Sequence, residues 1–81
     1  MTDYPPRPSR VITSEPCTIA RGDGSLLAGT LVNLSNLGFC VDAQNALLEG
    51  EHIEMRVLGL GRMRGTIHWA RKRRAGGLLD I

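Results

Sequence analysis

Short runs in which apolar and polar residues alternate, separated by glycine-containing turns, restrict the fold of this chain more than any other feature. In residues 53–58, IEMRVL, isoleucine, methionine and valine alternate with charged residues. A period of two residues is typical of a β-strand that buries one face. Similar runs, with turns at intervals of about ten residues, predict further strands at residues 11–20, 26–32, 39–42, 62–70 and 78–81.

Six short strands without a long helical pattern indicate an all-β fold. The only segment that could form a helical turn is AQNALLEGEH, residues 43–52, and Gly50 would end that turn early. A sheet this small cannot leave long edges exposed, which favours closure into a small six-stranded antiparallel barrel. The RGDGS segment predicts a tight hairpin between the first two strands, because Asp-Gly is a strong turn signal.

The first ten residues differ from the rest of the chain. They contain Pro5, Pro6 and Pro8 and show no apolar periodicity. Proline removes a backbone donor and favours extended conformations. We therefore expect a flexible N-terminal arm at residues 1–10 and the barrel at residues 11–81.

The length and the apolar runs limit where the protein acts. The chain has 81 residues, which is enough for one domain. No apolar run approaches the roughly 18 residues of a membrane-spanning helix, and the N-terminus lacks the pattern of a secretory signal. We therefore expect a cytoplasmic protein without membrane contact. In that reducing compartment, Cys17 and Cys40 are expected to be buried thiols.

The residues that could bind metal or perform catalysis form no recognisable pattern. No two of Cys17, Cys40, His52 and His68 have the spacing of a zinc site, so we expect no metal and solvent-facing histidines. The sequence shows no nucleophile–base pair and no carboxylate dyad. The GLGRMRG segment lacks the Gly-Lys-Ser/Thr of a phosphate loop. We expect neither enzymatic activity nor a cofactor.

Residues 33–39, NLSNLGF, join the second and third predicted strands with more polar groups than a chain reversal needs. A two-residue Asn-Gly turn would suffice, yet this loop has an amide at Asn33, a hydroxyl at Ser35 and a glycine at Gly38. The two side chains can either contact a ligand or cap N–H groups of the loop. Gly38 permits a positive φ or a close approach by a ligand, although a turn alone can require glycine.

These residues resemble the second motif of the PilZ domain, a bacterial receptor module for cyclic di-GMP. That motif is Asp/Asn-x-Ser-x-x-Gly, and the chain has it complete from Asn33 to Gly38. Trp69 near the end of the penultimate strand, the basic turn after it and a short apolar last strand also fit the family outline. The resemblance covers about residues 7–81.

The first motif of the family departs from its usual spacing. PilZ receptors usually carry Arg-x-x-x-Arg before the first strand, whereas this chain has Arg7-Pro8-Ser9-Arg10, one residue shorter. The resemblance implies that Arg7 and Arg10 close over Asn33, Ser35 and Gly38 to bind cyclic di-GMP. Arginine can pair in bidentate fashion with phosphate or with a guanine edge.

The same resemblance implies how a stand-alone domain would act. Ligand binding would order the arm against the barrel, and the changed surface would signal to an unidentified downstream protein. We expect a monomer or a weak dimer. The shortened arginine spacing leaves an alternative, in which the chain is a divergent PilZ-fold protein-interaction module that does not bind nucleotide.

Four consecutive basic residues at positions 71–74 form a second candidate surface. We interpret them as a solvated hairpin tip that attracts anions. Nucleic-acid binding is the weaker interpretation, because the net charge is only +2 and the nearest aromatic residue, Trp69, is expected to point inward with Ile67.

Overall fold

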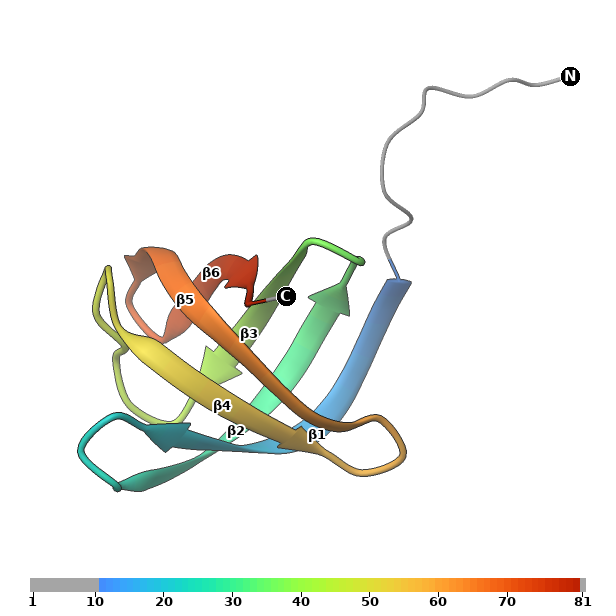
Figure 1. Ribbon diagram of the computed structural model, residues 1–81, viewed down its shortest axis with the longest axis horizontal. Coiled ribbons are helices and arrows are strands. Elements are labelled where there is room, and N and C mark those ends of the chain that lie inside the picture. The colour runs from blue at the N-terminus through green and yellow to red at the C-terminus, as the bar shows by residue number, and fades with distance from the viewer. Residues whose placement is uncertain (1–10, 81) are drawn as a thin grey trace, which may run out of the picture.

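Residues 11–80 are described by the computed structural model, with side chains from Ser14 onward. This part of the chain forms six β-strands (Figure 1): β1 Val11–Arg21, β2 Leu26–Leu34, β3 Gly38–Ala43, β4 His52–Val57, β5 Gly61–Arg71 and β6 Arg74–Leu79. All neighbours pair antiparallel in the order β1-β2-β3-β6-β5-β4, and β4 pairs with β1 to close the barrel. The predicted all-β, six-stranded barrel is confirmed, whereas the arm predicted at residues 1–10 lies outside the described residues.

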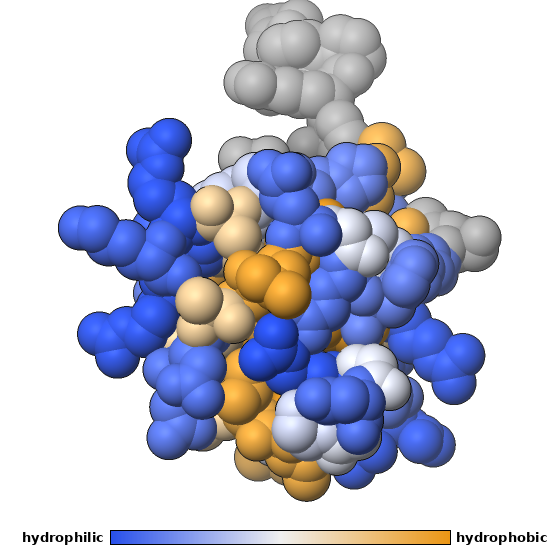
Figure 2. Space-filling view, turned by 90° about the vertical axis from the view of Figure 1, so that its left-hand side faces the viewer, coloured by the Kyte–Doolittle hydropathy of each residue, from blue (hydrophilic) through white to orange (hydrophobic). Residues whose placement is uncertain are grey.

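The interior of the barrel is filled mainly by aliphatic side chains that occupy the apolar positions of the alternating runs. Among the described residues, the largest fully buried side chains are Ile19, Leu31, Val41, Met55 and Ile67, one from each of the first five strands. Figure 2 views the barrel from the end that carries the β1–β2 turn and shows hydrophilic residues around a strip of hydrophobic ones. The two-residue periodicity therefore identified the buried face correctly.

The segment between β3 and β4, residues 44–51, does not form the helical turn that its sequence would allow. Leu47 is only 3% exposed and belongs to the core. The N–H of Gly50 donates to the carbonyl of Ile67 at 2.7 Å, which ties the segment to β5. The Glu51 carboxylate accepts two hydrogen bonds from the Arg21 guanidinium at 2.5 and 2.9 Å. These tertiary contacts outweigh the helical propensity of so short a segment.

The β1–β2 turn lies where the sequence predicts it, whereas the β5–β6 turn differs from the prediction. Between β1 and β2, Asp23 accepts hydrogen bonds from the N–H and the hydroxyl of Ser25, at 2.9 and 2.7 Å, as expected for a tight turn. The last strand was predicted at residues 78–81, but β6 spans Arg74–Leu79. The turn before it is shorter than predicted, with Lys72 at φ 56°. Gly76 and Gly77, expected in a turn, therefore lie within the strand.

Candidate ligand-binding site

The hydroxyl of Ser35 holds the β2–β3 loop in shape. The N–H of Ser35 donates to the carbonyl of Gly38 at 2.9 Å, which closes a loop of two residues. The Ser35 Oγ accepts hydrogen bonds from the N–H groups of Gly38 and Leu37, at 3.0 and 3.3 Å, and donates to the Gly38 carbonyl at 3.4 Å. The sequence left two roles open for Ser35, contact with a ligand and capping of the loop. In the structure its hydroxyl caps N–H groups of the loop.

Gly38 begins β3 and lies close to β6. Its φ is not positive, so the interpretation that this glycine supplies a positive φ is wrong. A Cβ at Gly38 would lie 2.9 Å from the carbonyl oxygen of Gly77. Close packing of the two strands is therefore sufficient to explain the glycine.

A β-bulge in β2 turns Asn33 to the outside of the barrel. Leu31 pairs with Val41, but the next pair is Asn33 with Cys40, so Val32 is the extra residue. An extra residue reverses the faces of the residues that follow it. The Asn33 side chain forms no hydrogen bond with any residue in the described part of the chain, so its amide is available to a ligand.

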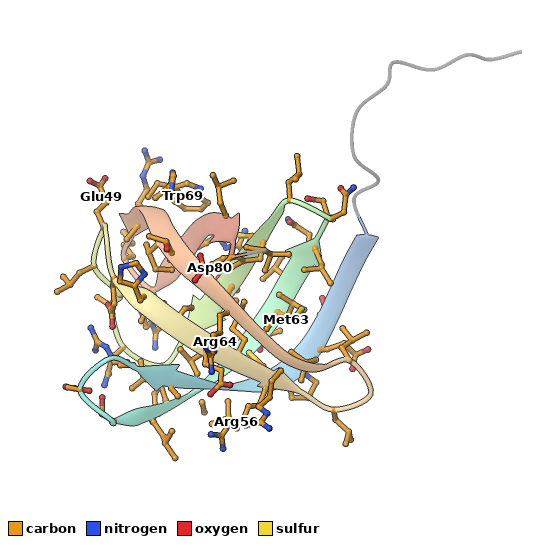
Figure 3. The ribbon with its side chains drawn as sticks, viewed as in Figure 1. Glu49, Arg56, Met63, Arg64, Trp69 and Asp80 are labelled. Carbon is orange, nitrogen blue, oxygen red and sulfur yellow. The ribbon has the colours of Figure 1, made fainter. Side chains whose placement is uncertain are left out.

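A second β-bulge, in β5, turns Trp69 outward in the same way. Ile67 pairs with Gly77 and Trp69 pairs with Gly76, so His68 is the extra residue. Ile67 is buried, whereas Trp69 is 44% exposed, and Figure 3 shows it outside the barrel. The prediction that Trp69 points inward with Ile67 is wrong, because the regular alternation stops at His68.

Gly76 provides the surface against which the indole packs. A Cβ at Gly76 would lie 2.6 Å from Cε2 and 2.7 Å from Cζ2 of Trp69. Only glycine leaves room for the ring at this position. A pair of glycines followed by a short apolar run, just after a tryptophan-containing strand, is the sequence signal that could have identified both β6 and this contact.

The two bulges place four positions in one row across the outer face of β2, β3, β6 and β5. The register joins Asn33 to Cys40, Cys40 to Gly76, and Gly76 to Trp69. We call these four residues the binding row. Three of them, Asn33, Cys40 and Trp69, line a hollow of about 390 Å³ together with the β2–β3 loop. Small-molecule sites usually enclose about 300–1,000 Å³, so a hollow of this size suits one part of a dinucleotide.

The predicted site residues are only partly within the structure. Asn33, Ser35 and Gly38 line the hollow together, whereas Arg7 and Arg10 lie outside the described residues. Val11 pairs with Leu34, so β1 begins beside the β2–β3 loop, as Figure 1 shows. Sequence reasoning missed Trp69 as a member of this site.

The cysteines and histidines of the described residues form no metal site. Cys17 and Cys40 are buried, as predicted, and burial raises the pKa of the Cys17 thiol. His52 and His68 are exposed, as predicted. Within residues 11–80, no three His, Cys, Asp or Glu side chains are placed to hold a metal ion. The same part of the chain contains no helix that could span a lipid bilayer.

Comparison with known proteins decides the family. The family profile described as PilZ domain matches residues 6–80 of the chain. This chain is a PilZ domain. Among solved structures, the PilZ domain of CeSA from a cellulose-synthesizing bacterium is similar, with a TM-score of 0.75 and 23% sequence identity, over 90% of this chain and 81% of that chain. No curated protein matched the sequence.

Membership of the PilZ family confirms the resemblance that the Asn33–Gly38 motif indicated. PilZ domains are regulatory binding modules, and their fold is known as a receptor for cyclic di-GMP. At 23% identity, the likeness to the CeSA domain concerns the fold alone.

Proposed function

We propose that this PilZ domain binds cyclic di-GMP on the binding row, with Arg7 and Arg10 closing over the ligand. Two separate bulges expose two groups on the same row, and this observation carries the proposal: the Asn33 amide, which has no hydrogen-bond partner among the described residues, and the half-exposed indole of Trp69. Hydrogen bonds to a base edge and stacking on an aromatic face are two contacts by which proteins bind a base. The hollow between them is the place where one guanine would lie.

Each side chain has a distinct role in this proposal. Trp69 stacks on one guanine, and the Asn33 amide bonds to the edge of a base. Ser35 is a positioning residue, because its hydroxyl already bonds to Leu37 and Gly38 within the loop. Gly38 keeps β3 close to β6, so that the loop and the indole remain on one surface.

The start of β1 supports a role for the two arginines. Val11 is paired with Leu34, one residue from both Asn33 and Ser35. Arg10 directly precedes Val11, and Arg7 lies three residues earlier in the sequence. Each residue extends a chain by at most about 3.3–3.6 Å, so the proposal requires Arg10 and Arg7 to extend over the β2–β3 loop within that length.

Ordering the arginine-bearing segment would be the signal to a partner protein. Fixing a backbone residue costs about 1–2 kcal/mol, so the contacts to the ligand must exceed that sum. Cyclic di-GMP offers two phosphates, and charge-assisted bidentate bonds from arginine are among the strongest hydrogen bonds available to a protein. A covered binding row would then present a different surface to the partner.

Calorimetric titration with cyclic di-GMP at moderate salt tests this function. We expect Arg10→Ala to weaken binding by about ten-fold or more, equivalent to about 1.4 kcal/mol, and Ser35→Ala to weaken it less. Arg62→Ala is the matched control, because Arg62 is exposed and lines a different hollow with Asp80. Unchanged affinity in Arg10→Ala would exclude the proposed role of the N-terminal arginines.

The same titration decides the alternative function. The one-residue deficit between Arg7 and Arg10 favours a divergent interaction module if the deficit prevents the two guanidinium groups from engaging one ligand. Absence of heat on titration, together with unchanged NMR signals from Asn33 and Trp69, would replace the receptor function with that alternative.

A further inference from the structure

A second and larger hollow lies next to the proposed nucleotide site and shares Trp69 with it. It measures about 1020 Å³ and is bounded by β2, the end of β3 and the β5–β6 turn. We call it the basic groove. The register places Thr30, Asp42, Arg74 and Arg71 in a row across it, adjacent to the binding row. Trp69 lines both hollows.

The groove carries an excess of positive charge. Arg74 donates two hydrogen bonds to the Asp42 carboxylate, at 2.7 and 2.9 Å. The Arg74 guanidinium lowers the pKa of Asp42, so this pair stays ionised at neutral pH. The other three cations that line the groove, Arg71, Lys72 and Arg73, form no ion pair within residues 11–80.

The turn that presents these cations is not arranged for stability. Arg71 pairs directly across the hairpin with Arg74, and like charges at opposed positions destabilise a β-ladder. Lys72 has a φ of 56°, in the left-handed region that glycine and asparagine occupy more readily. The turn therefore contains charged residues at positions where other residue types would stabilise it more, and these residues add positive charge to the groove.

The side chains around the groove fit an acidic protein segment better than a nucleic acid. Arginine forks match carboxylates in bidentate geometry. Binding of single-stranded nucleic acid uses successive aromatic platforms, whereas the groove offers one, Trp69, beside the backbone of Ala28 and Gly29. One exposed indole next to three unpaired cations instead suits an apolar side chain flanked by carboxylates.

We propose that the basic groove docks an acidic segment of a partner protein. Carboxylates of that segment pair with Arg71, Lys72 and Arg73, and one apolar side chain packs on the groove side of Trp69. This inference deepens the proposed function and rests on it, because the proposed function supplies the partner protein that receives the signal. Because Trp69 lines both hollows, nucleotide stacking and partner docking would share one indole.

Fluorescence anisotropy with defined probes tests the docking. The probes are labelled peptides of about twelve residues, (Glu-Glu-Leu)n and (Glu-Glu-Ser)n, and an oligothymidylate of about twelve nucleotides, a length within the site size of single-stranded binders. We expect the leucine peptide to bind more tightly than the serine peptide by about five-fold or more, because a leucine side chain packed on Trp69 removes apolar surface from water and a serine side chain does not. Equal affinity for both peptides, or tighter binding of the oligothymidylate, would overturn the proposal.

A matched pair of double variants separates the groove from general charge. Arg71→Glu with Arg73→Glu should weaken binding of the leucine peptide by about ten-fold or more. Arg62→Glu with Arg64→Glu reverses two arginines at the same spacing on β5 and should change the affinity by less than about two-fold. These control residues line a separate hollow with Asp80, and Figure 3 labels Arg64 and Asp80 apart from Trp69. Equal losses in the two double variants would contradict a specific groove.

Two further measurements keep this inference distinct from the nucleotide site. Asn33→Ala should weaken cyclic di-GMP binding but leave peptide binding intact, and the Arg71→Glu, Arg73→Glu variant should retain nucleotide binding. Glutamate at position 71 would face Arg74, so we expect this variant to fold, and its circular dichroism checks that. Peptide binding without nucleotide binding would refute only the receptor function, and the reverse result only the groove.

Discussion

At the scale of single residues, the site depends on the contact between Trp69 and Gly76. The indole lies outside the barrel, yet it is held in place because the residue beneath it has no side chain. An aromatic ring fixed in this way loses little conformational freedom when a base stacks on it. Gly76 is therefore as much part of the site as the polar residues of the loop, although it offers no group to a ligand.

Gly76→Ala is expected to displace the indole and to destabilise the fold. The new Cβ would lie 2.6 Å from Trp69 Cε2, and overpacking of this kind costs about 1–3 kcal/mol. Denaturant unfolding measures the loss. Gly22→Ala is the matched control, because its Cβ would lie 3.9 Å from the nearest heavy atom, the carbonyl oxygen of His52. Equal stability of Gly76→Ala and the parent protein would show that the ring does not rest on Gly76.

At the scale of elements, two bulges determine which side chains lie on the outer face of the sheet. One ion pair holds the segment between β3 and β4 in place. Glu51 lies just before β4 and pairs with Arg21 at the end of β1, while its carboxylate also accepts a hydrogen bond from the N–H of Leu48 at 2.9 Å. These bonds anchor the segment that carries Leu47 into the core. The Glu51–Arg21 pair therefore contributes to stability by holding the whole segment between β3 and β4 against the barrel.

Glu51→Gln is expected to lower stability at neutral pH by about 1–3 kcal/mol, the usual effect of removing a charged partner from a half-buried donor. The hydrogen bond from Arg21 lowers the pKa of Glu51. A carboxylate whose pKa is lowered by folding stabilises the fold above its ordinary pKa, and this contribution is lost as the pH falls through the lowered value. The difference between parent and variant should therefore shrink in acid.

Urea unfolding at neutral pH and at about pH 3, below the ordinary glutamate pKa, checks this prediction. Glu49→Gln is the control, because Glu49 is exposed and forms no ion pair within the described residues. A difference that stays constant over this pH range would mean that the charge on Glu51 does not contribute.

The sequence was sufficient for the barrel because two-residue periodicity marks most of the strands and their large buried side chains, although it does not mark Leu47 or Ala75 as core residues. The sequence was not sufficient to predict on which face of the sheet a residue lies once a bulge precedes it. The periodicity of β5 assigns Trp69 to the side of Ile67, and nothing in His68 itself marks the extra residue that reverses this side. The same limit applies to β6, since two glycines predict a turn unless the indole above them is known. The loop motif could be predicted, but the internal hydrogen bonds of Ser35 could not.

At the scale of the whole molecule, the pairing of β1 with β2 brings the start of β1 to one end of the binding row. The first described residue of β1 lies beside the β2–β3 loop, and the binding row extends from that loop to Trp69. The same indole also lines the basic groove. A ligand on the row therefore contacts a residue that also borders the surface proposed for the partner.

The most direct test of this account is a titration of the full chain with cyclic di-GMP, followed by the emission of Trp69. The chain contains one tryptophan, so its emission reports on the surroundings of Trp69, which lines the hollow at the binding row. We expect a saturable change in intensity with cyclic di-GMP, no comparable change with GMP at equal concentration, and loss of the change in Arg7→Ala with Arg10→Ala. Calorimetric binding of cyclic di-GMP without any change in Trp69 emission would contradict the account.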